Sequence, residues 1–338
     1  MCAANRKDEV LISIIVPIYN GEKYLAETLA SVRAQTYPKF ECLCYIDGGT
    51  DGSPEIVQAF TRADSRFKMV VQQNRGVAWT RNRGLDEAHG TFVVFLDEDD
   101  LLANHALESL LNVQRRTNAD CVQSVFCIFS HGNPSTESRS AGNADDFGLS
   151  YTPFDDFFGC AAKHTFNISV WGKLYRRVAL DGIRFPEDVY GADDFVFSAR
   201  LAMRLQSYAF LKAPTLYHYR MHPENLTSQM PMKYILGWMR SREIVWQELE
   251  NRFRGTARLD WIRRRFTAES FSWSVKKTCR RTYSEMEMRK CRSAFVRLIS
   301  NETIVPQGWR ERLKANLFIH ERTRLLRLFF PSLFRVAK

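Results

Sequence analysis

The sequence alternates short apolar runs with longer amphipathic stretches from residue 13 to about residue 129. The runs ISIIVPIY, FECLCYID and TFVVFLD are apolar on both faces, which is typical of strands buried in a parallel sheet. The stretches between them, such as EKYLAETLASVRAQ, repeat apolar residues at helical spacing. Because crossover helices cover both faces of such a sheet, the pattern predicts an α/β domain of doubly wound type with a mostly parallel, Rossmann-like sheet.

Charge divides the chain into two parts. Residues 1–230 carry 23 basic and 28 acidic side chains, whereas residues 231–338 carry 25 basic and 10 acidic ones. We therefore predict one α/β domain over residues 1–230 and a basic helical region over residues 231–338. Within the first part, the Gly-, Ser- and Asn-rich stretch HGNPSTESRSAGNADDFG predicts a loop. Basic regions attract phosphates on nucleic acid, anionic lipid or acidic polymers, and charge alone does not choose among them.

Long apolar runs are missing from the sequence. No stretch approaches the ~20 apolar residues of a membrane span, and the opening MCAANRKDEV lacks the apolar core of a secretory signal. The eight cysteines are scattered without metal-binding spacing, which favours reduced thiols. These features predict a cytoplasmic protein whose contact with a membrane is peripheral, at its inner face.

The apolar run FVVFL stops abruptly at four consecutive acidic residues, Asp97 to Asp100. Side chains two positions apart on an extended segment face the same way, so Asp97 and Asp99 can address one cation. Carboxylate oxygens suit Mg²⁺ or Mn²⁺ bridged to a diphosphate. The alternative is that Asp99 or Asp100 caps the helix that begins near His105.

Polar groups also follow other predicted strands. In YIDGGTDGS, Asp47 can accept a hydrogen bond from a base or a ribose, although a plain turn explains the segment equally well. In NRGVAWTRNRG, Arg81 is placed to neutralise phosphate oxygens, whereas Arg83 fits a solvated helix face. Ligands of open parallel sheets bind outside the carboxyl ends of the strands, so we expect these groups to line one crevice.

Four segments in this order resemble family 2 glycosyltransferases of GT-A fold: ISIIVPIYNGEKYLAETLASVRAQTY, IDGGTDGS, NRGVAWTRNRGLDEAHGTFVVFLDEDD and GADDF. The resemblance runs from about residue 11 to residue 230. It implies a metal-dependent, inverting transferase of hexosyl or N-acetylhexosaminyl type. Such an enzyme moves a sugar from a nucleotide-sugar, here expected to be a UDP-sugar, to a hydroxyl of a glycan or lipid-linked acceptor in cell-surface polysaccharide synthesis.

The resemblance also implies which residues hold the nucleotide and the metal. Those expected to contact the nucleotide-sugar are Pro17, Tyr19, Asp47, Arg81, Asp97 and Arg220. Those expected to hold Mg²⁺ or Mn²⁺ are Asp99, Asp97 and His222, with Asp99 as the direct ligand. His218 is expected to be structural. Around Asp47, Ile46 and Gly49 replace a common Asp and Ser, which leaves the nucleotide preference open.

The segment YGADDFVFSARL resembles the stretch that supplies the catalytic base. Asp194 would remove the proton from the acceptor hydroxyl, and Asp193 stands where the family usually has Glu. Attack from the face opposite the leaving group would invert the anomeric centre. In SVWGKLYRR, Trp171 matches an acceptor-side stretch, where a sugar ring could stack on the indole, and buried core packing is the alternative.

The basic C-terminal stretch GWRERLKANLFIHERTRLLRLFFPSLFRVAK alternates arginines with Leu, Phe and Ile at roughly helical spacing. Basic amphipathic helices often lie on anionic membrane surfaces, and a solvated helical bundle is the alternative. Aliphatic rather than aromatic partners for the basic residues disfavour nucleic acid. A nucleotidyltransferase should show a Gly-rich phosphate loop near the first strand, which VPIYNGEKY lacks. A non-catalytic scaffold that binds an anionic polymer is the alternative function.

Overall fold

The computed structural model forms two compact units, neither of them continuous in sequence. The first contains Met1–Phe154, Thr165–Glu187 and Phe197–Pro223, and the second contains Asp155–His164, Asp188–Val196 and Glu224–Lys338. The structure describes residues 10–130, 146–158, 166–262 and 283–300, together with residues 312, 314, 315 and 318. The domain boundary expected at residue 230 stays a prediction.

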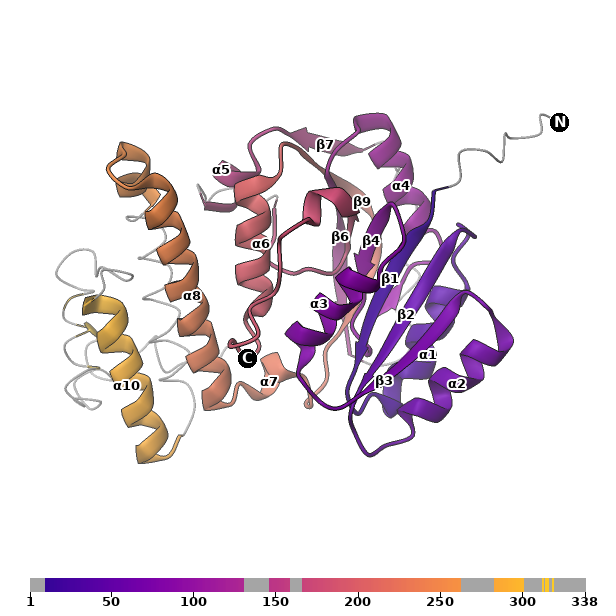
Figure 1. Cartoon of the computed structure of the whole chain (residues 1–338), viewed down its shortest axis with the longest axis horizontal. Helices are drawn as coiled ribbons and strands as arrows, with labels where there is room; N and C mark the ends of the chain where they lie inside the picture. The colour runs from indigo at the N-terminus through magenta and orange to yellow at the C-terminus, as the bar shows by residue number, and fades with distance from the viewer. Residues whose placement is uncertain are drawn as a thin grey trace. The chain divides into compact units, whose positions relative to one another are not determined.

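The first unit is built on one mixed sheet (Figure 1). Its first four strands are parallel and lie in the order β3-β2-β1-β4, so β1 lies between β2 and β4. Buried apolar residues line both faces of β1, β2 and β4, as a covered parallel sheet requires, whereas β3 at the edge is buried only at Phe67. The four strands are β1 (Ile12–Ile18), β2 (Phe40–Asp47), β3 (Phe67–Gln72) and β4 (Phe92–Phe95).

Beyond β4 the strand directions are mixed. β8 runs antiparallel to β4 and β6, β6 runs parallel to β9, and β9 pairs antiparallel with both β5 and β7. The strand β7 begins at Phe147, within the last residues of the predicted loop. Pairing with β9 satisfies the backbone hydrogen-bonding groups of these residues. The rest of that predicted loop, residues 131–145, lies outside the described residues. These strands are β5 (Leu101–Leu102), β6 (Cys121–Phe129), β7 (Phe147–Ser150), β8 (Lys173–Arg176) and β9 (Tyr208–Arg220).

Helices cover both faces of the parallel strands. Ile14 and Val16 of β1 lie in the main core with Leu29 of α1. Ile15 points to the other face, where a Cβ atom added to Gly84 of α3 would come within 2.5 Å of its side chain. This alternation confirms the predicted α/β architecture. The helices are α1 (Glu22–Arg33), α2 (Ser53–Ala63), α3 (Val77–Glu87), α4 (Ala106–Thr117) and the short η2 (Arg177–Leu180).

The second unit is helical where it is described. Its core joins Ile235 and Met239 of α8 to Cys291 and Phe295 of α10. The predicted basic stretch 308–338 lies outside the described residues except at positions 312, 314, 315 and 318. None of the helices among the described residues is both long and apolar enough to cross a membrane. Its own helices are α7 (Leu226–Gln229), α8 (Met232–Phe253) and α10 (Glu285–Ser300), while α5 (Pro153–Phe158) and α6 (Asp193–Arg204) contribute residues to both units.

Candidate functional site

Three neighbouring strands end in polar residues at one edge of the sheet. Tyr19 follows β1, Asp47 ends β2 and Asp97 lies two residues beyond β4. Because β1 pairs in parallel with both β2 and β4, their carboxyl ends lie side by side. The sheet order therefore brings together the three strand ends that the sequence predicted to line one crevice.

Asp47 is buried and uses both carboxylate oxygens. Its Oδ1 accepts hydrogen bonds from Gln72 Nε2 at 2.8 Å and from the Arg75 backbone N–H at 2.9 Å, and its Oδ2 accepts one from the Gly76 N–H at 2.8 Å. Gly76 has φ of 90°, a value that favours glycine, and it immediately precedes α3. Asp47 therefore fixes the turn between β3 and α3.

Pro17 and Tyr19 differ in exposure although they are two residues apart. Pro17 is buried within β1, whereas the Tyr19 side chain is 52% exposed just beyond the strand. An exposed aromatic ring beside the strand ends can pack on a planar base. The predicted contacts of both residues with a nucleotide stay predictions.

Arg81 joins α3 to the acidic segment. Its side chain is buried, and Nη2 donates to Asp97 Oδ1 at 2.8 Å. Arg83 instead pairs with Glu87 of the same helix at 2.7 Å and donates to Gln72 Oε1 at 2.9 Å. Of the two arginines, Arg81 is thus the one placed at the acidic segment.

Asp99 meets residues from the distant end of β9. Its Oδ2 lies 2.9 Å from His222 Nε2, and its backbone carbonyl accepts a hydrogen bond from Arg220 Nε at 2.8 Å. The Tyr24 ring of α1 lies 4.8 Å from the His222 ring. Two segments that resemblance placed in the same site are therefore in direct contact.

Asp100 is held by hydrogen bonds from β9 and does not cap a helix. It is fully buried, and it accepts hydrogen bonds from the Tyr217 hydroxyl at 2.5 Å and from the Arg220 backbone N–H at 2.7 Å. Helix α4 begins at Ala106, and its N-cap residue His105 makes no side-chain capping bond. The capping alternative for Asp99 and Asp100 is therefore wrong.

Negative charge is concentrated in the acidic segment. Burial and the neighbouring Asp97 carboxylate raise the pKa of Asp99, and the hydrogen bond with His222 opposes this shift. Burial, together with the charges of Asp99 and Asp97, raises the pKa of Glu98 to about 8. Burial likewise raises the pKa of Asp100 well above its usual range. A bound cation would compensate this crowding of carboxylates.

The carboxylates of Asp97 and Asp99 fit a hydrated divalent ion that is also bound by substrate phosphates. Asp97 and Asp99 present partly exposed carboxylates, with side chains 24% and 21% exposed. Among the described residues, no group of three or more His, Cys, Asp or Glu side chains is arranged to hold a metal ion. Mg²⁺ is commonly held by one or two carboxylates plus substrate phosphates, so Asp97 and Asp99 are sufficient as the protein ligands of such an ion.

Asp193 and Asp194 occupy the first turn of α6 and belong to the second unit. Asp193 is buried and Asp194 is half-buried. A carboxylate at a helix N-terminus interacts favourably with the helix dipole. The catalytic roles of both residues stay predictions.

Trp171 packs within an aromatic group on β6 and β9. Its ring stacks on Tyr217 at 4.4 Å and on Tyr219 at 5.5 Å, and it meets Phe126 edge-on at 4.9 Å. This arrangement corresponds to the core-packing alternative for Trp171. Stacking of a sugar on the same ring stays a prediction.

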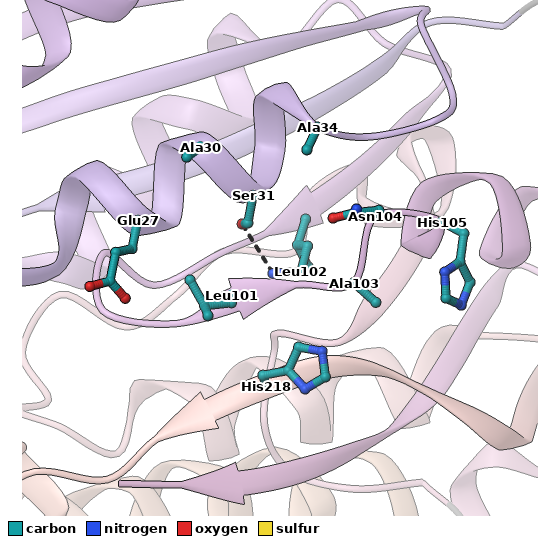
Figure 2. A pocket seen from close by; sticks show the side chains of 10 residues that line it. All are labelled: Glu27, Ala30, Ser31, Ala34, Leu101, Leu102, Ala103, Asn104, His105 and His218. Atoms are coloured by element: carbon teal, nitrogen blue, oxygen red, sulfur yellow. Dashed lines mark hydrogen bonds between the residues drawn. The ribbon is translucent and has the colours of Figure 1, made fainter. Parts of the chain in front are cut away.

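Sequence reasoning did not single out Glu27, which pairs with Arg220 Nη2 at 2.7 Å. No local motif marks Glu27, because it is one of several charged residues on α1. It also lines a cavity of about 350 Å³ between α1 and β5, together with Ser31 and His105 (Figure 2). His218 lines the same cavity, is buried, and lies 2.9 Å from Cys127 Sγ, which agrees with its expected structural role.

Comparison with known proteins identifies similar chains. The family described as "Glycosyl transferase family 2" matches residues 13–184. The putative glycosyltransferase EpsH of Bacillus subtilis is 32% identical over 230 residues, which cover 66% of this chain and 64% of that protein. A Campylobacter jejuni protein named GalNAc(5)-diNAcBac-PP-undecaprenol beta-1,3-glucosyltransferase is 30% identical over 182 residues, which cover 53% of this chain and 56% of that protein. Each match thus spans less than two thirds of the relative's length.

The fold is also shared with a solved structure. The Staphylococcus aureus protein TarS, residues 1–349 in complex with UDP-GlcNAc, superposes with a TM-score of 0.73 at 20% identity. The superposition covers 94% of this chain and 92% of that one. At this identity the likeness concerns the fold alone.

Proposed function

The chain belongs to glycosyl transferase family 2, and from this premise we propose that it transfers a sugar from a nucleotide-sugar to an acceptor hydroxyl with inversion at the anomeric carbon. The observation that carries the proposal is the meeting of four segments at one edge of the sheet. Strands β1, β2 and β4 end there, and Asp99 contacts His222 from beyond β9.

The proposed donor site uses the residues at this edge. Tyr19 packs on the base, and Asp47, which also holds the turn between β3 and α3, binds the same base. Asp97 and Asp99 hold Mg²⁺ or Mn²⁺, which when bound neutralises charge on the leaving diphosphate. The Arg81 guanidinium, 2.8 Å from Asp97 Oδ1, supplies a further cation beside the phosphates.

Asp194 is the proposed general base. It takes the proton from the acceptor hydroxyl, whose oxygen then attacks the anomeric carbon from the face opposite the diphosphate. That geometry inverts the anomeric centre, and general-base assistance is typically worth ~10²–10⁴-fold in rate. Asp193, buried beside it at the start of α6, is proposed to orient this turn.

The comparisons support a class of substrate. The TarS complex with UDP-GlcNAc supports a UDP-sugar donor of hexosyl or N-acetylhexosaminyl type. The name of the C. jejuni relative supports a glycan or lipid-linked acceptor, as in cell-surface polysaccharide synthesis. A cytoplasmic enzyme whose basic region touches the anionic inner face of a membrane would meet such an acceptor. Sedimentation of the protein with anionic vesicles but not with neutral ones would support that contact. Equally strong sedimentation with both kinds of vesicle would refute it.

The test uses purified protein, Mn²⁺ and a panel of UDP-, GDP- and dTDP-sugars, with release of the nucleoside diphosphate as the signal. Asp99→Ala is expected to abolish both turnover and metal-dependent nucleotide binding. Asp194→Ala is expected to abolish turnover but to retain nucleotide binding. Asp86→Asn, which removes a surface ion pair with Arg184, serves as the control and should behave as wild type. If the wild-type protein binds no nucleotide, the non-catalytic scaffold replaces this proposal.

A further inference from the structure

Arg220 holds two consecutive positions of the acidic segment. Its side chain is 4% exposed, and its guanidinium carbon lies 4.6 Å from the ring centroids of both Tyr24 and Phe129. Its Nε donates to the Asp99 carbonyl at 2.8 Å, and its backbone N–H donates to Asp100 Oδ1 at 2.7 Å. The position of Arg220 therefore sets the position of the Asp99 backbone.

Glu27 supplies the counter-charge of this buried cation. Its Oε2 accepts a hydrogen bond from Arg220 Nη2 at 2.7 Å. Glu27 itself is 57% exposed and lies at the end of the cavity between α1 and β5 (Figure 2). Removing one partner of a buried ion pair is strongly destabilising, because it leaves the other charge buried without compensation. A movement of that charge toward another acidic group would relieve this cost. The Arg220 side chain already contacts Asp99, at the backbone carbonyl of that residue.

We propose that Glu27 is a positioning residue for the cation-binding end of the site and that it acts through Arg220. With Glu27 in place, the guanidinium is held by α1, and Arg220 touches Asp99 only at its backbone carbonyl. Without the Glu27 charge, the guanidinium turns toward the Asp99 carboxylate and competes there with a cation. This inference rests on the proposed function, because it takes Asp99 to hold a divalent ion with a nucleotide diphosphate.

A purely structural role for Glu27 makes a different prediction. It would lower the thermal stability of the protein while leaving the metal dependence of nucleotide binding unchanged in the folded fraction. Glu27→Gln keeps the shape and one acceptor oxygen but removes the charge. Because the side chain is more than half exposed, this variant is expected to fold, and near-UV circular dichroism checks that it does.

The experiment measures binding of UDP, GDP and dTDP by calorimetry as a function of Mn²⁺ concentration. For the nucleotide that binds, Glu27→Gln should raise the Mn²⁺ concentration at half-saturation by about tenfold, the scale of a lost charge interaction of about 1.4 kcal/mol. Nucleotide binding without Mn²⁺ should change less than about twofold. Asp86→Asn removes an ion pair elsewhere on the same unit and should match wild type. Glu27→Asp, which keeps the charge, should lie closer to wild type than Glu27→Gln.

A double variant tests whether the effect passes through Arg220. In an Arg220→Gln background, Glu27→Gln should cause no further change, whereas independent effects would add. Wild-type metal dependence in Glu27→Gln, or additivity in the double variant, overturns the inference while leaving the proposed function intact. If the wild-type protein binds none of the three nucleotides with Mn²⁺, the proposed function and this inference fail together.

Discussion

Replacing Asp47 with asparagine should destabilise the first unit, because the new amide NH₂ group would face an N–H group that now donates to the carboxylate. The carboxylate accepts three hydrogen bonds, from the Gln72 side chain and from the backbone N–H groups of Arg75 and Gly76. If the asparagine oxygen keeps the first two, its amide faces the Gly76 N–H. If the amide turns over, it faces the other two donors instead. Either orientation leaves at least one of these part-buried N–H groups without its acceptor.

The surroundings do not allow Gln72 to relieve the mismatch. Its Oε1 already accepts from Arg83 Nη1 at 2.9 Å, and its Nε2 also donates to Thr80 Oγ1 at 2.9 Å. Turning the Gln72 amide over would break both contacts. One lost bond to a charged group costs about 1.5–3 kcal/mol, and weakening of the others brings the total to about 3 kcal/mol.

Thermal unfolding followed by circular dichroism measures this cost. For a unit of this size, about 3 kcal/mol corresponds to a Tm lower by roughly 6–12 °C. Asp86→Asn is the matched control, because its surface ion pair with Arg184 should be worth no more than about 1 kcal/mol. A Tm for Asp47→Asn within about 2 °C of wild type would refute the hydrogen-bond argument.

Two further changes test the site and the surface. Tyr217→Phe removes the hydroxyl that donates to the buried Asp100 and should lower the free energy of unfolding by about 1–3 kcal/mol in urea titrations, and a loss under about 0.5 kcal/mol would contradict it. For Asp64, hydrogen bonds from Arg66 hold the pKa below its usual value against the opposing effect of burial. Because the folded pKa is the lower one, the stabilisation is complete above about pH 4 and is lost as the pH falls through the folded pKa. The stability difference between wild type and Asp64→Asn should therefore stay constant between pH 6 and about pH 4 and shrink as the pH falls below about 4. A difference that stays constant down to about pH 3 would count against this pair.

Much of the first unit could be read from local patterns. The apolar runs became β1, β2 and β4, and the amphipathic stretch after Gly21 became α1, because two-residue and helical periodicities are local properties of the sequence. The exception is β7, whose first residues lie in the stretch predicted as a loop and which pairs with β9. Hydrogen bonding to a distant strand leaves no local pattern in the segment that receives it.

The site shows the same division. Asp47, Asp97 and Asp99 could be singled out because polar residues that end apolar strands stand out in the sequence. The role of Asp100 could not, because a helix cap and a buried partner of Tyr217 place the same residue type at the same position. Glu27 carried no signal at all, since its importance depends on Arg220 reaching α1.

The sequence by itself thus determined the alternation of strands and helices from β1 to β4 and the strand ends that carry polar groups. The tertiary structure alone decided that β1 lies between β2 and β4, and that the end of β9 returns to the acidic segment. The physical reason is range: periodicity depends on neighbouring residues, whereas the Asp99 contacts join positions more than 120 residues apart. Such contacts follow from strand pairing and core packing across the whole unit, which no short segment specifies.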